Sequence, residues 1–206
     1  MKQKNIFLKS EADAWFARNK ENLSRRNFED DNIVRAISDI SKSSSNTMLK
    51  ILEIGCGGGE RLNYISNSIN CSVSGVDPSL DAVNHCKLNN IDAIVGAADS
   101  LIHKDNTFDI VIFGFCLYLC DRGDLFRIST EADRVLKKEG WIIIQDFLQS
   151  LQYRMNIIIL LVLSLIRWII RHFLHGIQIT HATKLKSIIT KIKFLLILHM
   201  SGWRLQ

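Results

Sequence analysis

Apolar residues recur at two spacings along the first 147 residues, and each spacing predicts a different element. Amphipathic helices are expected from a start at Ser10, after the glycines at 55–59, and at 27–41, 79–88 and 121–138, the last ended by Gly140. Buried or alternating strands are expected between them, at 49–54, 71–77, 91–95, 108–113 and 141–147.

Strands that alternate with helices through short loops predict an α/β domain. We expect a Rossmann-like, doubly wound, mostly parallel sheet with helices on both faces. In such sheets ligands bind beyond the carboxyl ends of the strands, where the strand order reverses. The segments 55–59, 77, 98–99 and 114–117 all follow predicted strands. One pocket can therefore gather them.

The most informative of these segments is the turn after the first strand, where Gly55, Gly57, Gly58 and Gly59 precede a helical pattern. A strand, a glycine-rich turn and a helix bring backbone N–H groups against a ligand. Glycine is favoured because a Cβ would hold the ligand away from the backbone. The spacing is Gly-x-Gly-x-Gly, which differs from the Gly-x-Gly-x-x-Gly of dinucleotide binders.

Charge divides the chain unevenly. All 21 acidic residues lie at or before Asp146, so the first 146 residues carry a formal net charge of −3 and the last 60 carry +8. The basic balance belongs to the tail, and we expect no nucleic-acid partner. The predicted parts are a helical cap at 1–45, the ligand-binding domain at 46–148 and a basic, aliphatic extension at 149–206.

Two aromatic residues stand out in the predicted cap. Trp15 and Phe16 can share one helix face with Ala12. They either pack the helix on the domain, which we favour, or form an aromatic lid over the ligand.

The five cysteines include no Cys-x-x-Cys pair, and the N-terminal ten residues hold only a three-residue apolar run. These features predict reduced thiols and a cytoplasmic location. No Cys/His cluster has the spacing of metal ligands, so no metal is expected.

Several ordered motifs resemble those of the class I S-adenosylmethionine-dependent methyltransferases, in particular the type 11-like group. They are Glu53-Ile-Gly-Cys-Gly-Gly-Gly59, Val76-Asp77, Ala98-Asp99-Ser100-Leu101 and Asp105-Asn-Thr-Phe-Asp-Ile-Val-Ile112, and the resemblance continues through Arg134–Trp141 to cover roughly 47–148. One departure is Ile102-His103-Lys104, which stands where the family often has an apolar-Pro-aromatic step.

The resemblance implies S-adenosylmethionine as cofactor. Glu53 and the glycine turn would hold its methionine part, Asp77 would accept hydrogen bonds from both ribose hydroxyls, and Asp99 would receive the adenine amino group. Phe115 would border the sulfonium. The implied cofactor-binding set is Glu53, Gly55, Cys56, Gly57, Gly59, Asp77, Pro78, Asp99, Ser100 and Phe115.

Each carboxylate also has a structural interpretation. Asp77 could cap the helix after Pro78, Asp99 could be a turn residue, and Glu53 could pair with a surface lysine. A nicotinamide dinucleotide is a further alternative because Asp77 follows Gly59 by 18 residues. The glycine spacing argues against it.

The implied activity is a transferase reaction, in which a methyl group passes to an unidentified small-molecule acceptor by in-line displacement. Tyr118, Asp121 and Asp146 are weak candidates for a general base, and His85 and His103 are weaker still. None stands out, so the catalytic residue is left unassigned. The alternative function is a truncated or frame-altered, inactive module that only binds the cofactor.

The last 60 residues depart from the family's usual ending, a helix and an antiparallel hairpin that completes a seven-stranded sheet. Residues 155–166 carry no charge, but Arg167 and Arg171 interrupt a run that is shorter than the ~20 residues needed to span a bilayer. Two hypotheses are equally supported: contact with a membrane surface through 155–206, giving a peripheral location, or a tail produced by a changed reading frame or a truncation. Either predicts that the hairpin is missing or altered.

Overall fold

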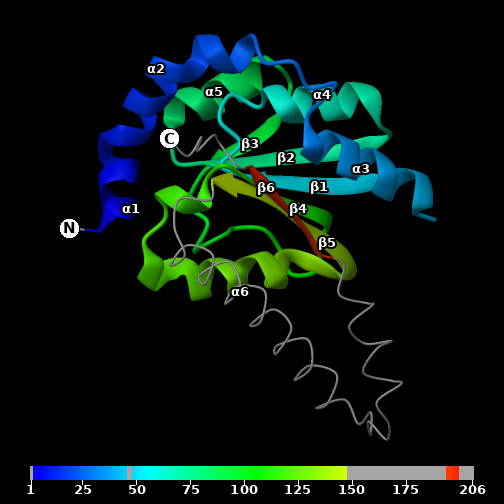
Figure 1. Ribbon diagram of the computed structural model, residues 1–206. Coiled ribbons are helices and arrows are strands. Elements are labelled where there is room, and N and C mark those ends of the chain that lie inside the picture. Colours follow the sequence, from blue (N-terminus) through cyan, green and yellow to red (C-terminus); the bar gives the residue numbers. More distant parts are fainter. Residues whose placement is uncertain (1, 46–47, 148–193, 200–206) are drawn as a thin grey trace, which may run out of the picture.

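A computed structural model describes residues 2–45 and 48–147 and the backbone of 194–199 (Figure 1). Its centre is a six-stranded sheet in the order β3-β2-β1-β4-β5-β6. All neighbouring strands are parallel. The strands are β1 Leu49–Ile54, β2 Cys71–Asp77, β3 Asp92–Val95, β4 Phe108–Gly114, β5 Leu136–Phe147 and β6 Phe194–His199.

Helices cover both faces of this sheet, which confirms the predicted fold class (Figure 1). Helices α3, α4 and α5 lie on one face and α6 lies on the other. The helical elements are α1 Gln3–Ile6, a π-helical turn Phe7–Glu11, α2 Ala12–Ser24, α3 Asn32–Ser43, α4 Glu60–Ser68, α5 Leu80–Leu88 and α6 Leu125–Val135, with 3₁₀ turns at Leu117–Leu119 and Arg122–Asp124.

Alternate residues of the central strands supply two cores, because successive side chains of a strand face opposite sides. Ile51 and Ile112 pack with Ile37 of α3 on one side. Leu52 and Val111 pack with the α6 side chains on the other. The continuous apolar runs read in the sequence therefore belong to strands that are buried on both faces.

The start of the first helix was predicted wrongly. The helical segment begins at Gln3, and Ser10 lies inside the π-helical turn. The cause is a cap from far along the chain: the two carboxylate oxygens of Asp121 accept hydrogen bonds from the backbone N–H groups of Gln3 (3.2 Å) and Lys4 (3.1 Å). No local residue could have signalled it.

Helix α3 begins five residues later than predicted, at Asn32 instead of Asn27. Asp31 is its N-cap, and the carboxylate accepts hydrogen bonds from the N–H groups of Ile33 (2.9 Å) and Val34 (3.2 Å). An extended Asp31 fixes where the helix starts.

The boundary between α6 and β5 was also predicted wrongly. The helix ends at Val135, and Gly140 lies within β5 instead of ending the helix. Lys137, inside the predicted helix, follows the end of α6, and its Nζ ion-pairs with Asp109 of β4 at 2.8 Å. The ladder between β4 and β5 shifts register between Phe108 and Ile110. Residues from Leu136 onward, which the helical pattern placed in the helix, therefore belong to β5.

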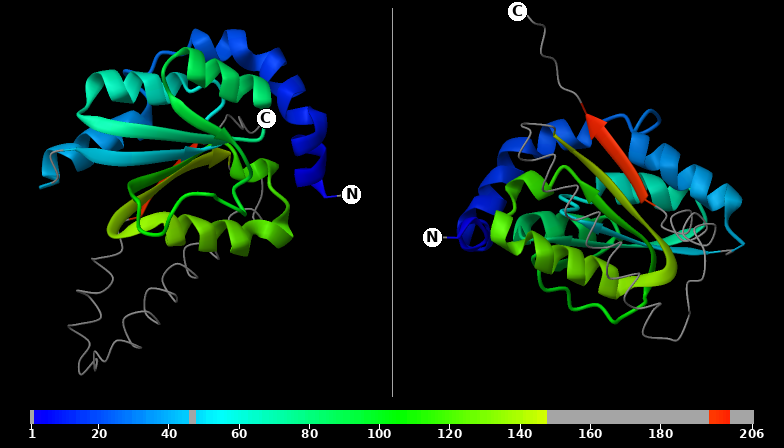
Figure 2. Two further views of the ribbon diagram at one scale, coloured as in Figure 1. Left: turned by 180° about the vertical axis from the view of Figure 1, so that it is seen from behind. Right: turned by 60° about the horizontal axis from the view of Figure 1, so that its bottom comes forward.

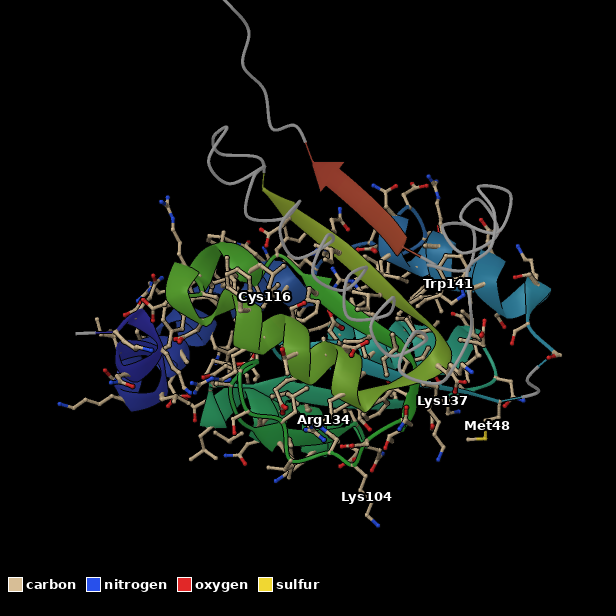
Figure 3. All side chains as sticks on the ribbon, turned by 90° about the horizontal axis from the view of Figure 1, so that it is seen from below. Met48, Lys104, Cys116, Arg134, Lys137 and Trp141 are labelled. Atoms are coloured by element: carbon tan, nitrogen blue, oxygen red, sulfur yellow. The ribbon has the colours of Figure 1, made fainter. Side chains whose placement is uncertain are left out.

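The N-terminal helices α1 and α2 stand beside the carboxyl ends of the strands (Figure 1 and Figure 2). Cys116, which follows β4, marks that end in Figure 3, whereas Met48 marks the opposite end. Because β1 leads outward to β2 and β3 and the chain then returns to β4, the strand order reverses between β1 and β4. This is the place where ligands bind in such sheets.

Predictions for the tail fall largely outside the described residues. The membrane contact at 155–206 and the charge-free run at 155–166 lie there, except for the backbone of β6, which pairs parallel with β5. Among the helices within the described ranges, none is both long enough and apolar enough to cross a bilayer.

The tight contact at Gly140 gives a test of the β4–β5 arrangement. A Cβ there would lie 2.9 Å from the backbone oxygen of Asp109 and 2.7 Å from the Leu136 side chain. We expect Gly140→Ala to lower the free energy of unfolding by about 1–3 kcal/mol, measured by urea denaturation. Gly123→Ala is the matched control, since nothing lies within 4 Å of its Cβ, and equal stability losses in the two variants would contradict this packing.

Candidate functional site

A cavity of about 650 Å³ opens at the carboxyl ends of the strands, between the sheet and the N-terminal helices. Its floor includes the turn after β1, and its opposite wall includes apolar side chains of the N-terminal segment such as Phe7, Trp15 and Leu23. The volume is in the range of sites for cofactors and small molecules.

The glycine turn is shaped by contacts that a side chain would prevent. Gly55 has φ +74°, and a Cβ there would lie 2.6 Å from Cβ of Cys116. Its N–H donates to the carbonyl oxygen of Val76 at 2.7 Å, which ties the turn to β2. Gly57 also has positive φ (+55°) and lines the cavity. The turn therefore presents bare backbone to a ligand.

Asp77, at the end of β2, holds this turn in place. Its Oδ2 accepts from the N–H of Gly57 (2.8 Å) and its Oδ1 accepts from the N–H of Ser79 (2.9 Å). Burial raises the pKa of the Asp77 carboxyl, and the two N–H donors oppose that shift. The carboxylate thus supports the turn that begins α5 and still lines the cavity, where its remaining lone pairs can accept from a ligand.

Glu53 lies at the end of β1 and is 1% exposed. Its Oε1 accepts a hydrogen bond from Nη1 of Arg61, at the start of α4, so its partner is a buried arginine and not a surface lysine. The second oxygen, Oε2, is buried without a hydrogen-bond partner among the described residues. Burial raises the pKa of the Glu53 carboxyl, against the opposing effect of Arg61.

The ion pair extends to a second carboxylate. Nε and Nη2 of Arg61 each lie 3.4 Å from Oδ2 of Asp31, and Nη2 of Arg26 lies 3.1 Å from the same oxygen. Two arginines and two carboxylates therefore form one cluster beside the glycine turn, which we call the Glu53–Arg61 cluster. It joins β1, α4 and the start of α3.

Two aromatic rings flank the guanidinium of Arg26. Its Cζ lies 5.6 Å from the ring centroids of both Phe28 and Phe115. Phe115 follows β4 with φ +59°, a rare conformation for a residue with a large side chain. Strained backbone conformations are concentrated at functional sites, so Phe115 is a candidate site residue.

Asp99, in the loop after β3, is buried and already has a cationic partner. Nζ of Lys4 lies 2.6 Å from its Oδ2, and Arg127 Nη1 lies 4.0 Å from the same oxygen. A parallel contact joins Lys2 to Asp124 at 2.8 Å. The N-terminal segment is thus fastened over the cavity by ion pairs at its first turn.

The structure brings most of the predicted cofactor-binding residues to one cavity. Those that line it are Glu53, Gly55, Cys56, Gly57, Asp77, Pro78, Asp99 and Phe115. Two others do not: Gly59 caps α4 with φ +80° and packs against Cys86, and Ser100 is exposed on the turn beyond Asp99.

The three candidate bases differ in their surroundings. Tyr118 lines the cavity, but burial and then Asp146 raise the pKa of its hydroxyl. Asp121 uses both oxygens to cap α1. Asp146 is 0% exposed, does not line the cavity, and accepts from the N–H of Tyr118 at 3.2 Å.

The other residues singled out in the sequence fall into different environments. Phe16 is buried and contacts His85 (6.0 Å between ring centroids), as expected for a residue that packs the helix on the domain. Trp15 lines the cavity, where the alternative role over a ligand was expected. Neither His85 nor His103 lines the cavity, and His103 stacks edge-on against Phe108.

The cysteines of the described residues are all free thiols. A hydrogen bond with Cys86, and then burial, raise the pKa of Cys56, and burial raises the pKa of Cys120 to about 12. Within 2–45 and 48–147, no group of three or more His, Cys, Asp or Glu side chains is arranged to hold a metal ion.

Sequence analysis missed several residues of the site: Lys4, Arg26, Asp31, Arg61 and Gln145. Two local signals existed. Arg61 lies two residues after the last glycine of the turn, next to the acidic Glu60. Asp31 precedes the apolar stripe of α3 as an N-cap residue does. The contacts of Lys4 and Gln145 depend on tertiary structure alone.

Comparison with known proteins agrees with this geometry. Residues 52–144 match the model of the methyltransferase domain family. An uncharacterised methyltransferase of Synechocystis sp. is 32% identical over 93 residues, which is 44% of this chain and 43% of the relative. An uncharacterised protein of Methanocaldococcus jannaschii is 36% identical over 92 residues, 44% of this chain and 34% of the relative. The chain therefore spans less than half the length of these curated relatives.

Solved structures share the fold. A chain from the complex between the Trm112 methyltransferase activator of Haloferax volcanii and a proposed methyltransferase aligns with TM-score 0.50 and 22% identity, covering 65% of this chain and 57% of that one. A TehB-like S-adenosylmethionine-dependent methyltransferase of Corynebacterium glutamicum aligns with TM-score 0.51 and 19% identity, covering 62% of this chain and 68% of that one.

Family match, sheet topology and glycine turn agree on one assignment. The parallel sheet and the glycine turn after β1 are those expected from the sequence, and the match runs from the second half of β1 through most of β5. Residues 52–144, which are 93 of the 206, are therefore similar to a methyltransferase domain in both sequence and fold.

Proposed function

We propose that this chain transfers a methyl group from S-adenosylmethionine to a small-molecule acceptor. The observation that carries the proposal is the line of carboxylates along the floor of one cavity. Glu53 ends β1, Asp77 ends β2 and Asp99 follows β3, with the bare glycine turn beside them. In this proposal 46–148 binds the cofactor and 1–45 caps it.

The residues of the cavity fit this cofactor in order across the sheet. Asp99 lies beyond β3, where it would accept from the adenine amino group, and Asp77 on β2 would accept from the ribose diol. On β1, the unpartnered and buried Oε2 of Glu53 would accept from the ammonium group. Arg26, missed in the sequence, belongs to the Glu53–Arg61 cluster and lines the cavity, where it would pair with the carboxylate of the cofactor's methionine part.

Bound S-adenosylmethionine supplies a methyl group already activated by its sulfonium. The chain's own task is to align the acceptor with that carbon and to exclude water. The N-terminal helices serve the second purpose, because Lys2 and Lys4 fasten them to Asp124 and Asp99 across the cavity mouth. Phe115 would border the sulfonium from the end of β4.

Calorimetry with S-adenosylhomocysteine and NAD tests the cofactor class. We expect micromolar binding of the sulfur nucleoside and none of NAD, and Asp77→Asn to weaken nucleoside binding at least about tenfold because an acceptor oxygen is lost. Asp81→Asn is the matched control, being the same change on the exposed side of α5. Binding of NAD alone would contradict the proposal. Methyl transfer to candidate acceptors then separates an enzyme from a module that only binds.

The raised pKa of Glu53 predicts a pH dependence. A neutral Glu53 does not attract an ammonium, so affinity for S-adenosylhomocysteine is expected to weaken as pH falls through the raised pKa. Binding should also release a proton near that pH, measurable by calorimetry in buffers of different ionisation enthalpy between about pH 5 and about pH 8. In Glu53→Gln the proton release should vanish. An unchanged release would assign it to another group.

The Lys4–Asp99 ion pair predicts a gain in affinity. Lys4→Met removes the partner of a buried carboxylate in the free protein, and the adenine amino group would restore a donor in the complex. We therefore expect nucleoside affinity to rise about threefold or more, measured by calorimetry. Lys9→Met, on the same N-terminal segment but outside the cavity lining, is the control. Weaker binding by Lys4→Met would instead mean that Lys4 itself holds the ligand.

A further inference from the structure

Gln145, near the end of β5, is a buried side chain that the proposed cofactor site does not use. It is 4% exposed and lines the cavity. Its Oε1 has no hydrogen-bond partner among the described residues. A buried amide oxygen without a hydrogen-bond donor destabilises the folded protein, so its presence in a cavity suggests a ligand that donates to it.

The register of the sheet places Gln145 on the same side as Glu53. Both lie two residues beyond isoleucines of one core, Ile143 and Ile51, and alternate residues of parallel strands share a face. Between them lies Gly114, which pairs with Gln145, and a Cβ at Gly114 would collide with Arg61. The missing side chain leaves room for the Arg61 guanidinium that donates to Glu53, and Gly114 itself lines the cavity.

Gln145 lies on β5, beyond the strands assigned to the proposed cofactor in the order of the sheet. The carboxylates assigned to adenine, ribose and ammonium follow the order β3, β2, β1, and the next strands are β4 and β5. Phe115, proposed to border the sulfonium, follows β4, and its N–H donates to the backbone oxygen of Gln145 at 2.7 Å. A molecule that receives the methyl group would therefore lie against Gln145.

The charged side chains that line the cavity favour some chemical classes of methyl acceptor over others. Among the described residues, eight carboxylates and three cationic side chains line it. The acids are Asp30, Asp31, Glu53, Glu60, Asp77, Asp99, Asp121 and Asp124, and the bases are Lys4, Arg26 and Arg61. Such a lining disfavours carboxylate or phosphate acceptors and favours a cation or a neutral donor.

A hydroxyl acceptor needs a base, and the candidates are poorly placed to serve as one. Asp121 is engaged with the first turn of α1, Asp146 lies outside the cavity, and the pKa of Tyr118 is raised. A free-base amine, in contrast, attacks with its own lone pair and keeps its proton until after the transfer.

We propose that the acceptor is a small amine on an apolar body and that Gln145 orients it. This rests on the proposed function. Oε1 of Gln145 accepts an N–H of the amine, leaving the nitrogen lone pair free for the methyl carbon. The new N–C bond forms as the S–C bond breaks, the electron pair of that bond stays on sulfur, and the product ammonium loses a proton to water. Apolar side chains of the N-terminal segment, Phe7, Leu8, Trp15, Leu23 and Phe28, line the cavity for the rest of the molecule.

The test measures probe binding to the chain saturated with S-adenosylhomocysteine. The probes are 2-phenylethylamine, 2-phenylethanol and phenylacetate, which share one body and differ in the polar group. We expect the amine to bind at least about tenfold more tightly than the other two. Gln145→Leu should weaken amine binding by about tenfold or more and leave S-adenosylhomocysteine affinity within about twofold. Gln145→Glu, which keeps an acceptor oxygen, should retain amine binding.

Three results would overturn the acceptor assignment while leaving the cofactor proposal intact: no amine binding, equal binding of the alcohol or the carboxylate, or unchanged amine binding in Gln145→Leu. Each is read against S-adenosylhomocysteine affinity in the same sample, which also reports that the variant is folded. If the wild-type chain fails to bind S-adenosylhomocysteine, the proposed function itself is overturned, and this inference with it.

Discussion

The buried ion pair between Glu53 and Arg61 is the constraint on which the site depends. Removing two charges from water costs several kcal/mol per ion unless each finds a partner, and here Asp31 completes the pairing. The pair fixes the end of β1 to the start of α4, and Asp31 carries the same constraint to the start of α3. Among the described residues, one oxygen of Glu53 has no hydrogen-bond donor, and this is the atom to which the proposed function assigns the ammonium group.

The glycine turn is shaped by its neighbours as much as by its own flexibility. Asp77 accepts from Gly57, Val76 accepts from Gly55, and Cys116 occupies the space where a side chain of Gly55 would lie. The same Asp77 carboxylate supports the start of α5 through Ser79. The structural and functional roles weighed for this residue are therefore compatible, because a carboxylate has lone pairs enough for backbone and ligand together.

Sequence reasoning predicted the first four strands well, because buried strands leave a strong local signal, but it did not predict β6. The strands from Leu49 to Phe113 appear where apolar runs placed them. It failed where distant residues decide: Asp121 starts α1, and pairing with β4 draws Leu136 and Lys137 out of the expected helix. In the site, the sequence motifs identified the residues at the strand ends. They did not identify Lys4 and Arg26, because these residues reach the cavity through tertiary packing of the N-terminal segment, which the spacing of residues in the sequence does not indicate.

The distant cap on α1 also orders the events of folding. The N–H of Gln3 is satisfied by a carboxylate 118 positions further along the chain. This cap forms only when the segment between β4 and α6 has folded against the N-terminal helices. Closure of the cavity mouth at α1 is therefore coupled to the folding of that segment.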